Sequence, residues 1–185
     1  DRPNHIILPL SGLVSQNYPY LTLSIYDNGE TEFSAPASAL MQFLVSGFDW
    51  TVRYFKIKEH TVLKLRQLAL DNTNAEFLLI LDDDSLPMPD VLRECLMGAL
   101  HNENVGCISP CCIDYKNVRG YKGYTCDWIK ESPKSIPLEV RGFYRYNSIT
   151  EEDRFVDIRD GPGGCTLYNV KVLREIGGFL STDWD

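Results

Sequence analysis

An apolar run, Phe77–Leu81, is followed directly by three aspartates at positions 82 to 84. A run of this length is typical of a strand that is buried on both faces of a parallel sheet. Open α/β sheets bind ligands at the carboxyl ends of their strands, where these aspartates fall. Side chains two apart in a strand share a face, so Asp82 and Asp84 are expected to point together and Asp83 away. Paired carboxylates of this kind suit a hard cation such as Mg²⁺ or Mn²⁺.

Helical and extended patterns alternate on both sides of this run in a chain of 185 residues. Apolar residues recur at helical spacing over residues 6–14, 36–45, 61–72, 91–100 and 170–176. Extended patterns cover residues 21–26, 51–57, 77–81 and 105–109. Such alternation predicts a single α/β domain, residues 1–185, with largely parallel strands. Pro9 is expected to weaken or kink the first helix.

The charge and the apolar content of the chain limit its partners. A formal net charge of -8 argues against nucleic acid, whose binders normally show a basic face, and against anionic membrane. The apolar run at 77–81 is far too short to span a bilayer, and no signal-peptide pattern opens the chain. The six cysteines lack zinc-ribbon spacing and are expected to be reduced. We expect a cytoplasmic domain that associates with a membrane only through flanks outside this segment.

Residues 113–150 interrupt the alternation and are expected to form a variable insertion. Residues 114–146 hold seven Lys or Arg against four Asp or Glu, although the whole chain is acidic. The aromatic residues there are Tyr115, Tyr121, Tyr124, Trp128, Phe143, Tyr144 and Tyr146. Aromatic rings provide an apolar face on which a sugar packs, but core packing of the insertion explains them as well. If they form a platform, the basic excess favours an acceptor or phosphate that carries negative charge.

Four segments resemble, in order, the motifs of family 2 glycosyltransferases. The run from Phe77 to Leu92 resembles the DxD segment of that family. Asp27-Asn28-Gly29 resembles its nucleotide-contacting acidic turn. Arg66 falls where the family often has an arginine, although the neighbouring Asn of that pattern is Gln67 here. The passage from Gly163 to Phe179 is similar to the strand, helix and Gly-Gly-Phe turn that lie beside the donor sugar.

This resemblance implies a GT-A (Rossmann-like) fold, a three-layer sandwich with a mostly parallel central sheet whose first strand is missing from the sequence. It implies transfer of a sugar, with inversion, from a nucleotide-diphosphate-sugar donor of the UDP or dTDP type to a hydroxyl of a glycan or other acceptor, aided by Mn²⁺ or Mg²⁺. By this likeness Asp84 binds the metal together with Asp82. The nucleotide-sugar-binding residues are then Asp27, Asn28, Arg66, Asp82, Asp83, Gly163 and Gly164.

An inverting transfer needs a general base that removes the proton of the acceptor hydroxyl. In the family this base is acidic and follows the Gly-Gly-Phe turn, which assigns the role to Asp183 or Asp185. The acceptor-side elements of the family are expected beyond the end of this sequence. We therefore expect this segment alone to bind donor weakly or to be inactive.

Other interpretations stay open at this point. A run of aspartates after a strand is also typical of a solvated turn or a helix N-cap. A carbohydrate- or nucleotide-binding module would keep the fold without turnover. A haloacid-dehalogenase-like phosphatase also ends an apolar strand in Asp-x-Asp, with the first aspartate as nucleophile. Leu86 stands where that family has Thr or Val, and its motif strand lies near the start of the chain, which makes this alternative the weakest.

Overall fold

The computed structural model describes residues 2–16, 18–58, 61–101, 105–110 and 164–179. The elements follow in the order α1 (Ile7–Val14), β1 (Thr22–Asp27), α2 (Ala35–Gly47), β2 (Thr51–Lys56), α3 (Val62–Asp71), β3 (Phe77–Leu81), α4 (Val91–His101), β4 (Cys107–Ile108), β5 (Cys165–Asn169) and α7 (Val170–Glu175). The helical and extended patterns up to residue 101 predict these elements to within two residues at each end. The expected insertion at 113–150 lies outside the described residues.

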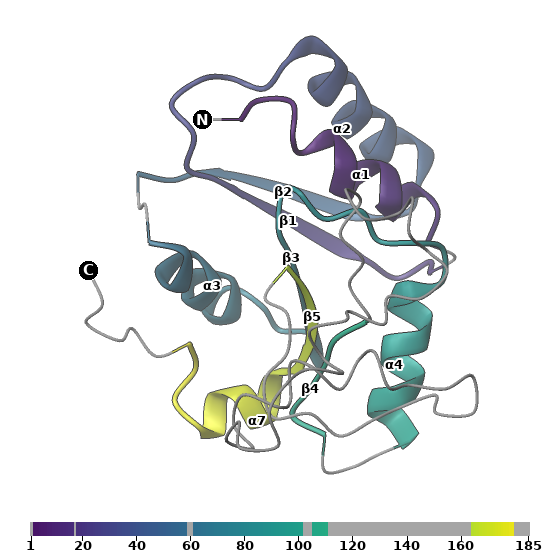
Figure 1. The fold of residues 1–185 in the computed structure, drawn as a ribbon, viewed down its shortest axis with the longest axis vertical. Helices are drawn as coiled ribbons and strands as arrows, with labels where there is room; N and C mark the ends of the chain where they lie inside the picture. The colour runs from purple at the N-terminus through teal and green to yellow at the C-terminus, as the bar shows by residue number, and fades with distance from the viewer. Residues whose placement is uncertain (1, 17, 59–60, 102–104, 111–163, 180–185) are drawn as a thin grey trace, which may run out of the picture.

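The described strands form two hydrogen-bonded sheets (Figure 1). β1 and β2 are parallel, with Thr22 opposite Thr51 and Asp27 opposite Lys56. β5 lies between β3 and β4 and is antiparallel to both. Since β3 and β4 are each antiparallel to the same strand, they run parallel to one another. β5 is therefore the strand that departs from the parallel pattern expected from the sequence.

Helices cover both faces of the strands, which gives the expected three layers (Figure 1). The direction of each β3 side chain shows this, because successive residues of a strand face opposite sides. Leu78 packs on one side against Leu70 of α3 and the buried residues of α7. Leu79 packs on the other side near α4, and Leu81 packs against the cluster formed by α1, β1 and α2. The continuous apolar run of β3 is thus explained by burial on both faces.

Helix ends follow local sequence signals. α2 begins after Ser34, whose Oγ accepts a hydrogen bond of 3.4 Å from the Ala37 amide. α7 ends before Gly177 and Gly178, whose φ angles of 94° and 82° lie in the left-handed region that glycine adopts without strain. Pro9 lies in the first turn of α1, where its missing N–H costs no intrahelical hydrogen bond, so the helix runs through it to Val14.

Two further expectations concern the described part of the chain. No helix there is both long enough and apolar enough to cross a membrane. Cys95, Cys107 and Cys165, the cysteines in the described part, form no disulfide.

Candidate functional site

The three aspartates lie in a turn at the carboxyl end of β3, and we call the segment Asp82–Ser85 the acid turn. β3 ends at Leu81, and the amide of Ser85 donates to the carbonyl of Asp82 at 3.1 Å. The backbone leaves the strand at this point, and a shared role of Asp82 and Asp84 stays a prediction. Asp83 and Asp84 share one partner, and Asp82 has another.

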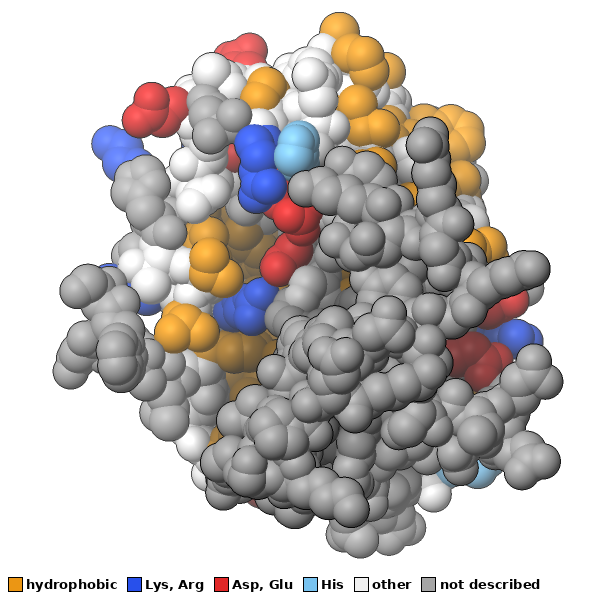
Figure 2. All heavy atoms as spheres, in the orientation of Figure 1, with side chains coloured by type: hydrophobic (Ala, Val, Ile, Leu, Met, Phe, Trp, Pro, Cys, Tyr) orange, Lys and Arg blue, Asp and Glu red, His pale blue; other side chains and the backbone are white. Residues whose placement is uncertain are grey.

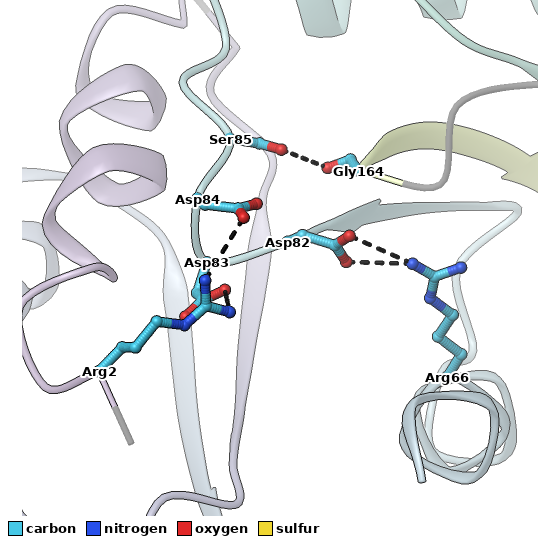
Figure 3. A network of polar contacts seen from close by, with 7 residues as sticks. All are labelled: Arg2, Arg66, Asp82, Asp83, Asp84, Ser85 and Gly164. Atoms are coloured by element: carbon cyan, nitrogen blue, oxygen red, sulfur yellow. Dashed lines mark hydrogen bonds and ion pairs between the residues drawn. The ribbon is translucent and has the colours of Figure 1, made fainter. Parts of the chain in front are cut away.

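Two arginines neutralise the acid turn from opposite sides (Figure 3). Arg2 donates to Asp83 at 2.8 Å and to Asp84 at 3.5 Å. Arg66 of α3 donates to both oxygens of Asp82, at 3.1 and 3.4 Å. Figure 2 shows the corresponding pattern, with acidic side chains between two groups of basic side chains in the middle of this face. Arg66 therefore contacts the acid turn, and its role in binding the donor stays a prediction.

Gly164 packs directly against the acid turn (Figure 3). Its carbonyl oxygen accepts from the Asp82 amide at 2.9 Å and from the Ser85 hydroxyl at 2.8 Å. A Cβ atom at this position would lie 2.9 Å from the Ser85 Oγ atom, so a larger residue would force the Ser85 hydroxyl to move. β5 thus begins beside the acid turn, where sequence analysis placed the glycine pair. Gly163 lies outside the described residues.

Asp27, at the end of β1, is buried, with 8% of its surface exposed, and its carboxylate is hydrogen-bonded on both oxygens. One oxygen accepts from the Gly29 amide at 2.8 Å. The other accepts from the Tyr54 hydroxyl at 2.5 Å and from the Lys56 ammonium at 2.8 Å. Asn28, which follows it, is half-buried.

The protonation of this cluster follows from its contacts. Burial alone would raise the pKa of Asp27, but the hydrogen bonds from Lys56, Tyr54 and Gly29 outweigh it and lower the pKa below the ordinary value. Burial and the neighbouring Asp27 carboxylate raise the pKa of Tyr54 to about 12. Asp27 is therefore a fixed negative charge, and Tyr54 stays protonated as a donor to it.

The amino-terminal segment contacts the acid turn and the start of α2. Arg2 contacts the acid turn, and the carbonyl oxygen of Pro3 accepts from the Ser34 amide at 3.4 Å, at the end of the loop that follows Asp27. Leu81, next to the acid turn, packs against the core cluster that contains Ile25 of β1. The two regions that sequence analysis assigned to one ligand are thus linked through the same segment and the same core.

Three partners of these acids were not predicted from the sequence. Tyr54 and Lys56 stand two apart in a strand parallel to β1, so strand alternation combined with the register would have placed them on one face. Arg2 is separated by 81 residues from Asp83, and no local pattern points to it. Asp183 and Asp185, the candidates for the general base, lie outside the described residues.

The acid turn suits a divalent cation. Carboxylate oxygens are the ligands that Mg²⁺ and Mn²⁺ prefer, and the side chains of Asp83 and Asp84 are 41% and 57% exposed, so an ion can reach them from solvent. Among the described residues, no group of three or more His, Cys, Asp and Glu side chains is gathered closely enough to hold a metal alone. One or two carboxylates completed by substrate phosphates fit this geometry.

The fold and the acid turn define an α/β domain of the GT-A glycosyltransferase type. The mannosyltransferase PcManGT from Pyrobaculum calidifontis, solved in complex with GDP-Man and Mn²⁺, has a similar fold with a TM-score of 0.57 at 15% sequence identity. The match covers 95% of this chain and 44% of that chain, so this chain spans less than half of its structural neighbour. A search of the curated proteins found no match.

The family model described as glycosyl transferase family 2 matches residues 10–177. The match includes β1, the acid turn and the start of the Gly177-Gly178 turn. The chain belongs to glycosyl transferase family 2. The resemblance found in its sequence is thereby confirmed, and the phosphatase alternative has no support from either comparison.

Proposed function

We propose that this chain forms the donor-binding part of an inverting, metal-dependent glycosyltransferase that moves a sugar from a nucleotide-diphosphate sugar to an acceptor hydroxyl. The acid turn carries the proposal. Three carboxylates stand at the end of β3, two of them exposed and neutralised by the half-exposed side chain of Arg2. A divalent cation with a diphosphate can replace such a partner, whereas it cannot reach a buried ion pair.

The residues of the chain divide the work of donor binding in this proposal. Asp84, with Asp82, holds Mn²⁺ or Mg²⁺, which neutralises the departing diphosphate. Asp83 binds the ribose, and Arg66 binds the diphosphate or orients Asp82, which it already contacts. Asp27 is fully engaged by its own chain, so it acts by shaping the loop at Asn28 that receives the base or ribose.

Gly164, with Gly163, brings backbone close to the donor sugar in this proposal, which the contact of Gly164 with the acid turn supports.

The acceptor side of the reaction is assigned to residues outside the described part. Asp183 or Asp185 is the proposed general base, because each follows the turn that ends α7 by a few residues. The basic, aromatic segment at 113–150 is the proposed acceptor region.

The nucleotide is the least defined part of the proposal. Sequence analysis favours UDP or dTDP, whereas the structural neighbour binds GDP-Man. A test of donor binding must therefore include all three bases. The cytoplasm stays the predicted compartment.

Isothermal calorimetry with UDP, dTDP and GDP, each with and without Mn²⁺, tests the donor site. We expect one nucleotide to bind with a Mn²⁺ requirement, and Asp84→Ala to abolish that requirement along with most of the affinity. Asp49→Ala is the matched control, because Asp49 precedes β2, away from Lys56 at the other end of the strand. It should bind as the wild type does.

The outcomes separate the possible functions. Binding without any metal effect, or binding that Asp84→Ala leaves intact, removes the metal role of the acid turn. Metal-dependent binding with neither donor hydrolysis nor sugar transfer would identify a binding module that keeps the fold. Transfer of sugar with inverted anomeric configuration, followed by NMR, would establish the enzyme.

A further inference from the structure

Gln16, directly after α1, is a buried side chain whose role the proposed function does not explain. It is 4% exposed, and both ends of its amide are hydrogen-bonded. Its Nε2 donates to the carbonyl oxygens of Gly12 at 3.0 Å and Met88 at 2.8 Å. Its Oε1 accepts from the amide of Leu92 at 3.0 Å. Gln16 therefore ties the end of α1 to a segment more than 70 residues away in the sequence.

The segment that Gln16 holds is a tight turn between the acid turn and α4. The amide of Val91 donates to the Met88 carbonyl at 3.3 Å, and Asp90 has a φ of 66°. Proline at the second position, here Pro89, and a positive φ at the third are features of a type II turn, where glycine or asparagine is usual at the third position. Among the described residues, Asp90 is the sole non-glycine with positive φ. Such a conformation persists when neighbouring contacts hold it, and Gln16 contacts both sides of it.

The acid turn is consequently fixed at two ends. Its first and last residues, Asp82 and Ser85, are hydrogen-bonded to the Gly164 carbonyl. Beyond it, Pro87 packs on Gly12, where a Cβ atom would come within 2.6 Å of the Pro87 carbonyl oxygen, and Gln16 holds the next residue. Asp84 lies between these anchors, and its exposed side chain pairs with Arg2. Its backbone position depends on the anchors on either side.

We propose that Gln16 is a positioning residue for the metal-binding aspartates: it holds the Met88–Val91 turn and thereby sets where Asp84 stands. This inference rests on the proposed function, since it assigns Gln16 to the same donor site. Gln16 touches neither metal nor substrate. It acts by keeping the acid turn in one conformation, which lowers the entropy that is lost when the ion binds.

The test compares two variants of Gln16 by Mn²⁺-dependent nucleotide binding. Gln16→Met keeps the volume but removes the hydrogen bonds of the side-chain amide, and it should weaken metal-dependent binding by about tenfold, a typical effect of losing hydrogen bonds in a buried site. Gln16→Glu keeps the acceptor for the Leu92 amide, so its affinity for the nucleotide in the presence of Mn²⁺ should lie between those of Gln16→Met and the wild type. Binding of the nucleotide without metal should change less, because the proposed loop at Asn28 is outside the turn that Gln16 holds.

Rescue supplies a second readout. Asp90→Gly in the Gln16→Met background should recover about threefold in metal-dependent affinity, because glycine adopts the positive φ without needing the contacts of Gln16. The matched control is Asn169→Ala, which removes the amide that caps α7 at the end of β5 opposite Phe77, far from the acid turn. It should lower the midpoint of urea unfolding and leave metal binding as in the wild type.

Each outcome decides the inference. A Gln16→Met protein that is less stable but binds Mn²⁺ and nucleotide as the wild type does overturns it. The inference also fails if Asn169→Ala weakens metal binding as much as Gln16→Met does, since general loosening then explains the effect. Absence of metal-dependent binding in the wild type itself is the failure of the proposed function, and it is seen before any variant is compared.

Discussion

The two acidic regions of this domain hold their carboxylates in different ways. Asp27 is buried and accepts hydrogen bonds from Gly29, Tyr54 and Lys56. Asp83 and Asp84 are exposed and share one arginine, whose own side chain is 50% exposed. The carboxylate of Asp27 is fully hydrogen-bonded within the protein, whereas Asp83 and Asp84 share an arginine that solvent or an ion can displace. Position at the end of a strand therefore does not by itself decide whether an aspartate binds a ligand.

The difference between the two acidic regions should be largest in the stability lost when an aspartate of each region is replaced. Asp27→Ala is expected to lower the free energy of unfolding by about 2–3 kcal/mol, because it removes a buried acceptor and leaves the Tyr54 hydroxyl and the Lys56 ammonium without it. Asp83→Ala should cost less than about 0.5 kcal/mol, as exposed ion pairs contribute little. Urea unfolding followed by circular dichroism measures both. Equal losses in the two variants would remove the distinction between the regions.

Arg66 provides an intermediate case, because its side chain is 16% exposed and that of Asp82 is 39% exposed. Arg66→Ala should lower the free energy of unfolding by about 1 kcal/mol, through lost packing of the stem as well as the lost ion pair. Arg93→Ala is the control, since Arg93 is 56% exposed and pairs with its own helix. If Arg66→Ala lowers the free energy of unfolding no more than this control does, the ion pair of Asp82 contributes as little to stability as those of Asp83 and Asp84.

An Arg2 variant tests whether a metal ion can displace Arg2 from Asp83 and Asp84. Removing it by Arg2→Ala should strengthen Mn²⁺ binding by up to about fivefold, because the ion no longer competes with a guanidinium whose pairing contributes less than about 1 kcal/mol. Arg53→Ala removes the same charge from an exposed position of β2 and should have a smaller effect. Weaker Mn²⁺ binding in Arg2→Ala would instead make Arg2 a contributor to the donor site.

The pH dependence of stability gives the smallest effect, visible only at the extremes. Because the pKa of Asp27 is lowered on folding, its contribution is present above the ordinary pKa of 3.8 and is lost as the pH falls through the folded value. The stability difference between wild type and Asp27→Ala should therefore shrink below about pH 4. A difference that stays constant down to about pH 2 would contradict the lowered pKa.

Tyr54 behaves in the opposite sense at alkaline pH. Its pKa is raised from 10.0 to about 12, so the stability that the protonated hydroxyl provides is complete below the ordinary value and is lost as the pH rises through the folded one. The decline of stability between these two pH values should be shallower in Tyr54→Phe than in the wild type. Unfolding midpoints measured across this interval check the prediction.

Local sequence determined most of the fold. The apolar run of β3, the Ser34 and Pro36 start of α2 and the Gly177-Gly178 end of α7 are signals that act within a few residues, and the structure follows each of them. The motifs also identified the family, which the family model confirms over residues 10–177. These properties depend on burial pattern and backbone preference, which a short stretch of chain carries by itself.

The partners of the acidic side chains were decided only by tertiary structure. Strand alternation does not predict the partners of the three aspartates, because the chain leaves the strand at Leu81 and turns. Nothing near Asp83 in the sequence predicts Arg2, and nothing near Met88 predicts Gln16. Contacts between residues so far apart depend on how the layers pack, and no periodic pattern records that packing. The sequence thus determined the elements and the candidate residues, and the packing determined which of their side chains are held by partners distant in the sequence.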